Sequence, residues 1–156
     1  MVRISARISW VPAALFIVAV PVFLLTASVT WAFNSPGMYE AGFEKYQIPR
    51  SSGITMEDLR QVGAELRGYL NSTDEPLSIR TRILGVEQEL FNAQEISHMR
   101  DVKQLVLGVY VLGAASAIYL IAAVLLGFWR RRARFMDTLA PRLMWAGGLT
   151  VVLLLA

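Results

Sequence analysis

The sequence predicts an α-helical membrane protein with about three spans, the third incomplete, and a small extracytoplasmic domain between spans one and two. That domain is expected to be mixed α/β or mostly α. Two uncharged apolar runs each exceed the roughly 20 residues needed to cross a bilayer core. Charged residues make up only 17% of the chain, against about 25% in soluble domains. The mean hydropathy of the chain is correspondingly high, at +0.48.

The first apolar run covers residues 10–33, "WVPAALFIVAVPVFLLTASVTWAF". Trp10 and Trp31 lie near its ends, as interfacial aromatic residues do. Pro21, near the middle, predicts a kink or an open backbone carbonyl. A cleaved signal peptide ending at Ala32 is the alternative. Because the run is longer than the usual apolar region of about 7–15 residues, we favour a retained span.

The second run covers residues 104–129, and its small residues could let another helix approach closely: Gly113, Ala114, Ser116 and Ala117. The third run, 143–156, has only 14 residues. A helix of that length reaches about 21 Å, whereas the bilayer core is about 30 Å thick. It is either a re-entrant half-helix or a span cut in the middle, and we expect the cut.

Basic residues predict the orientation in the cell membrane. They cluster before the first run and between the second and third, in the cytoplasmic segments 1–9 and 130–142: Arg3, Arg7, Arg130, Arg131, Arg132, Arg134 and Arg142. Residues 34–103 hold eight basic and eleven acidic residues, and so carry a net charge of −3. The positive-inside rule makes this segment extracytoplasmic in a multi-pass protein. The basic loop is expected to meet anionic membrane lipid, and no nucleic-acid partner is expected.

The extracytoplasmic segment contains two patterns of regular structure. Thr55 followed by Asp58 predicts a helix start. The apolar residues that follow indicate an amphipathic helix: Met56, Leu59, Val62, Leu66 and Leu70. "NSTDEP" ends it. "LSIRTRI" then alternates like a strand, and Gly85 could turn it into a hairpin with "VEQELF".

Asn92 followed by Glu95 predicts the start of a helix that runs into the second apolar run. On that helix Glu95, His98 and Asp101 lie three residues apart, so neighbours can touch. A histidine oriented by a carboxylate could act as the base in acyl transfer. Arg100 and Lys103 could then hold the oxyanion. The competing interpretation is an ordinary surface histidine with solvated charges.

Several classes of site are excluded. The chain has no cysteine, which rules out disulfides, thiolate metal sites and a cysteine nucleophile on these residues. One histidine cannot form a multi-histidine metal site, and no Walker loop, GxGxxG or HExxH motif occurs.

The stretch "LFNAQEISHMRDVKQL" resembles the signature of the membrane family of the lipoprotein intramolecular transacylase Lit. The resemblance rests on Glu95, His98, Met99 and the triplet Asp101, Val102 and Lys103, and on the order of spans and loops. It implies an enzyme that moves an acyl chain of a diacylglyceryl lipoprotein from glycerol to the amine of the N-terminal cysteine. His98 would be the general acid and base, and no cofactor would be needed. Membrane lipid and a lipid-modified protein would be the partners.

The family pattern has four spans and a second functional histidine after the third, which this sequence does not contain. We therefore expect a truncated chain or a degenerate relative. Two other functions remain open. One is a non-enzymatic membrane protein whose outer domain binds a peptide, lipid or partner subunit. The other is a single-anchor protein with a cleaved signal. The sequence does not determine the oligomeric state.

Overall fold

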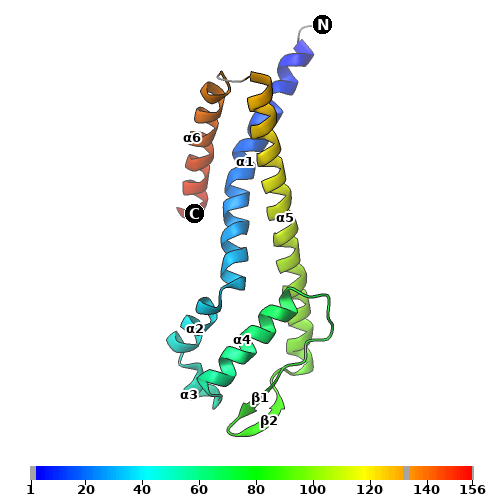
Figure 1. Ribbon diagram of the computed structural model, residues 1–156, viewed down its shortest axis with the longest axis vertical. Coiled ribbons are helices and arrows are strands. Elements are labelled where there is room, and N and C mark those ends of the chain that lie inside the picture. Colours follow the sequence, from blue (N-terminus) through cyan, green and yellow to red (C-terminus); the bar gives the residue numbers. More distant parts are fainter. Residues whose placement is uncertain (1–2, 132–133, 156) are drawn as a thin grey trace. The chain divides into compact units, whose positions relative to one another are not determined.

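The computed structural model describes residues 3–131 and 134–155, which are mainly helical (Figure 1). The elements in chain order are α1 (Arg3–Asn34), α2 (Pro36–Lys45), α3 (Ile48–Ser52), α4 (Met56–Leu70), β1 (Arg80–Ile83), β2 (Val86–Glu89), α5 (Ala93–Arg131) and α6 (Arg134–Leu155). The chain divides into two compact units. The first comprises residues 1–28 and 110–156, and the second residues 29–109.

Three long apolar helices confirm the predicted fold class. By length and composition, three helical segments could cross a membrane: Val11–Asn34, Ala93–Arg130 and Met136–Leu155. Helix α1 stays helical through both Pro12 and Pro21. Helix α6 starts at Arg134, inside the segment expected to be a basic loop. The prediction counted only uninterrupted apolar residues, whereas a helix can continue through charged residues because its backbone bonds do not depend on side-chain charge.

Helices α1 and α5 approach each other closely at the predicted small-residue patch. A Cβ atom added to Gly113 would lie 2.9 Å from the hydroxyl oxygen of Thr26. The Thr26 hydroxyl donates to the carbonyl of Val22 at 2.8 Å, so its polar group is satisfied within α1. Ser116 is also buried. Further along, the Tyr119 hydroxyl donates to the carbonyl of Pro12 at 2.9 Å.

In the second unit, α4 starts and packs as its sequence predicts. The Thr55 hydroxyl oxygen accepts from the backbone N–H of Asp58 at 3.1 Å, which satisfies one free donor of the first turn. The apolar stripe turns inward, with Leu59, Val62 and Leu70 buried. The helix ends at Leu70, before the "NSTDEP" break.

The predicted hairpin is also present. Strands β1 and β2 pair antiparallel, from Arg80 opposite Glu89 to Ile83 opposite Val86. Leu84 and Gly85 form the two-residue turn, with φ values of 52° and 86°. Positive φ at both positions matches the twist of a tight hairpin.

The core of this unit combines α4, the segment that leads into β1 and the first turns of α5. Its buried residues are Val62, Tyr69, Leu70, Leu77 and Ile79. From α5, Ile96, Met99 and Val102 pack against them. Because these three residues recur every third position, one face of α5 is fixed against the core.

Candidate active site

The start of α5 is fixed by reciprocal capping. The Asn92 side-chain oxygen accepts from the backbone N–H groups of Gln94, at 2.9 Å, and Glu95, at 3.0 Å. The Glu95 carboxylate accepts from the backbone N–H of Asn92 at 2.8 Å. This is a capping box. It confirms the predicted helix start, and it engages one of the two carboxylates that were expected to orient His98.

His98 lies on the exposed side of α5. Its side chain is exposed, whereas the nearby side chains of Ile96 and Met99 pack against the core. Asp101, one turn later, is exposed as well. Within the described parts of the chain, neither side chain makes a hydrogen bond or ion pair with another residue. The imidazole is therefore free to meet a ligand from outside.

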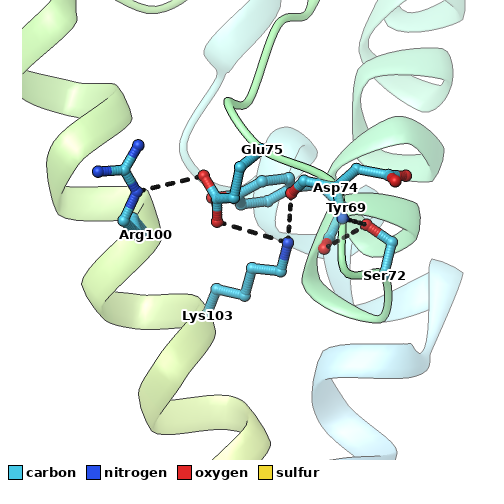
Figure 2. Close-up of polar contacts among 6 residues, drawn as sticks. All are labelled: Tyr69, Ser72, Asp74, Glu75, Arg100 and Lys103. Carbon is cyan, nitrogen blue, oxygen red and sulfur yellow. Dashed lines mark hydrogen bonds and ion pairs between the residues drawn. The ribbon is translucent and has the colours of Figure 1, made fainter.

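Arg100 and Lys103, the two cations near His98 on α5, bind Glu75 in the turn after α4 (Figure 2). The Arg100 guanidinium Nε lies 3.2 Å from Oε2 of Glu75. The Lys103 ammonium lies 3.5 Å from Oε1 of the same carboxylate. It also donates to the carbonyl of Asp74 at 2.6 Å, and it sits 4.0 Å from the centre of the Tyr69 ring. We call Tyr69, Asp74, Glu75, Arg100 and Lys103 the Glu75 cluster.

The burial of Lys103 indicates a structural role for its ammonium group. Its side chain is only 5% exposed, and a buried ammonium is tolerated where charged or polar groups surround it. The Glu75 cluster supplies a carboxylate, a carbonyl and an aromatic face. Lys103 therefore holds the turn to α5. Arg100 is half-exposed and has only the one carboxylate partner among the described residues.

The same contacts shift two pKa values. Burial raises the pKa of the Tyr69 hydroxyl, and its hydrogen bond to Glu75 raises it further. For Glu75, desolvation acts to raise the pKa, but hydrogen bonds from Tyr69 and Arg100 and the charge of Lys103 outweigh it. The net effect is a lowered pKa. The carboxylate thus stays ionised between its two cations.

Sequence reasoning named both cations of this cluster but missed their partners. Glu75 lies in a segment interpreted only as a helix break, and Tyr69 was not singled out. A lysine next to a span, facing a core, implies a carboxylate partner. However, the extracytoplasmic segment offers eleven acidic residues, and local patterns do not choose among them. Within residues 3–131 and 134–155, no group of three or more His, Asp or Glu side chains could hold a metal ion.

Residues 14–156 match the family model described as lipoprotein intramolecular transacylase Lit. The chain belongs to the Lit family. The match covers most of the chain, including all of α5. Comparisons with curated proteins and with solved structures give no significant match. Membership of the Lit family confirms the suspected resemblance. Together with the three apolar helices, it makes this a membrane protein of a family that acts on lipoproteins.

Proposed function

We propose that this chain contributes to intramolecular acyl transfer within a diacylglyceryl lipoprotein, from the second glycerol carbon to the α-amine of the N-terminal cysteine. The Lit family match over residues 14–156 carries the proposal. The product would be a lyso-form lipoprotein with an amide-linked acyl chain. Donor ester and acceptor amine belong to one molecule, so holding them together supplies much of the rate advantage.

In the proposed reaction the neutral amine attacks the ester carbonyl. A C–N bond forms, the C–O bond to glycerol breaks, and the amine proton passes to the departing glycerol oxygen. His98 is the proposed group that takes and returns this proton. Its exposed imidazole, unpartnered among the described residues, supports this role. Arg100 is the proposed contact for the developing oxyanion, because it keeps donors beyond those used on Glu75.

We give two of the expected site residues a smaller part in this proposal. Glu95 is bound to the helix start, and Lys103 is enclosed by the Glu75 cluster. Of the two carboxylates expected to orient the histidine, Asp101 keeps the role in this proposal, because it lies one turn from His98 and is exposed. Its contact with the imidazole would form when the substrate excludes water.

The experiment expresses the natural open reading frame that encodes this chain in a bacterium lacking lipoprotein N-acylation. Mass spectrometry of lipoprotein N-termini should show the N-acylated lyso-form. His98→Ala should abolish it, while Ser97→Ala, an exposed neighbour on the same helix, should retain it. An unchanged acyl pattern with the unaltered protein would refute the proposed function. Full activity of His98→Ala would refute only the role of this residue.

A further inference from the structure

The first unit contains a groove that the proposed acyl transfer does not use. It has a volume of about 480 Å³ and lies among α1, α5 and α6. Phe16 from α1 and Leu126 from α5 contribute large apolar walls. The volume falls in the range of about 300–1,000 Å³ typical of small-molecule sites.

Small residues of α5 create the hollow. Ala123 and Gly127 both line it, and residues four apart lie on the same side of a helix. Neither has a side chain that could fill the space next to α1. The hydrogen bond from Tyr119 to the carbonyl of Pro12 ties the two helices together beside the groove. The walls that α1 and α5 contribute are therefore mainly apolar, and a hydrogen bond joins the two helices.

The groove also has a charged component. Arg130 and Arg142 line it, and no Asp or Glu is among the described lining residues. Within the described parts of the chain, neither guanidinium has a hydrogen-bond or ion-pair partner. Guanidinium groups bind phosphate in a bidentate manner. An apolar groove that carries two guanidiniums without an ion-pair partner among the described residues complements a molecule with an alkyl chain and a phosphate.

We propose that this groove binds one anionic phospholipid, with an acyl chain against Phe16, Ala123 and Leu126 and the phosphate at Arg130 and Arg142. Both arginines belong to the basic end of the spans, where anionic lipid headgroups are attracted most strongly. A free phosphate would leave the apolar walls empty. A zwitterionic lipid would place its own cation beside the two arginines. The anionic lipid satisfies both parts of the site.

The test is native mass spectrometry of the full chain in detergent, titrated separately with phosphatidylglycerol, phosphatidylcholine and glycerol 3-phosphate. We expect one saturable phosphatidylglycerol adduct, bound about tenfold more tightly than phosphatidylcholine. Glycerol 3-phosphate should not displace it. Changing both Arg130→Gln and Arg142→Gln should bring phosphatidylglycerol to the affinity of phosphatidylcholine. Ala123→Trp should weaken both lipids by filling the apolar part.

Arg50→Gln is a control for loss of charge as such, because it removes one exposed positive charge in the other unit and should leave lipid binding unchanged. Equal affinity for the two lipids would overturn the proposal. So would phosphatidylglycerol binding that survives loss of both arginines, or displacement by glycerol 3-phosphate alone. The titration is repeated with the product of the natural open reading frame. Loss of the adduct there would mean that protein fills the groove, and would also overturn the proposal.

Discussion

At the scale of single residues, the contacts of Lys103 differ most from the role that the sequence suggested. Its place five residues after His98 suggested an oxyanion contact. The structure shows an ammonium enclosed by Glu75, the carbonyl of Asp74 and the ring of Tyr69. A side chain with those partners stabilises the fold, because removing it leaves the part-buried carbonyl of Asp74 without its donor.

Lys103→Met should therefore destabilise the second unit while preserving the apolar volume of the side chain. The loss should be about 2 kcal/mol, the scale of hydrogen bonds to charged groups. Arg100→Gln is the control, because it removes an exposed ion pair with the same carboxylate and should have a smaller effect. Pulse proteolysis of the full chain in urea measures both. Unchanged stability of Lys103→Met, together with lost activity, would restore the oxyanion role.

The Glu75 cluster also predicts how stability varies with pH. The lowered pKa of Glu75 gives a contribution present above the unfolded pKa of about 4.3 and lost as pH falls through the folded pKa. The raised pKa of Tyr69 gives a contribution present below about pH 10 and lost as pH rises through the folded pKa. Urea midpoints across pH should fall at both ends. If the fall of the urea midpoint at acid pH is unchanged in Glu75→Gln, the contribution assigned to Glu75 is contradicted.

At the scale of elements, local sequence signals predicted much of the fold. The caps at Thr55 and Asn92 and the hairpin turn at Gly85 each depend on a few neighbouring residues, and all three are confirmed. The apolar stripe of α4 is confirmed because helical period alone decides which residues face inward. Partners distant in sequence were not predictable in this way, and neither was the first residue of α6.

The packing of α1 against α5 leads to an element-scale prediction. Gly113→Val would put a side chain against Thr26, where even a Cβ atom would lie at 2.9 Å. The two helices must then separate, so the detergent-solubilised chain should unfold at lower temperature. Gly108→Val is the matched control on the same helix, because nothing lies within 4 Å of a Cβ atom there. Equal melting temperatures for the two variants would contradict the close approach.

At the scale of the whole molecule, the three apolar helices and the family were predictable because long apolar runs and a short signature are visible directly. The candidate site was predictable only in part. The position of His98 on α5 followed from helix period, but the partners of its neighbours depended on how the 71–76 turn packs. The Glu75–Lys103 pair joins residues 28 positions apart, and no local pattern encodes that contact.

The proposed orientation in the membrane is testable because the chain has no cysteine. A single cysteine in place of Glu87, which is exposed in β2, should react with an impermeant maleimide on intact cells. A single cysteine in place of Ala140, exposed in α6, should react only after permeabilisation. The reverse labelling pattern would invert the proposed topology.

The central claim is intramolecular acyl transfer, and a crossover measurement tests it most directly. Two diacylglyceryl lipopeptides of different peptide mass are mixed, and only one carries a deuterated acyl chain on the second glycerol carbon. Membranes containing the product of the natural open reading frame are added, and the N-terminal amides are read by mass spectrometry. The account predicts deuterium only on the peptide that started with it, and none with His98→Ala. Deuterium distributed over both peptides, or no amide at all, would contradict it.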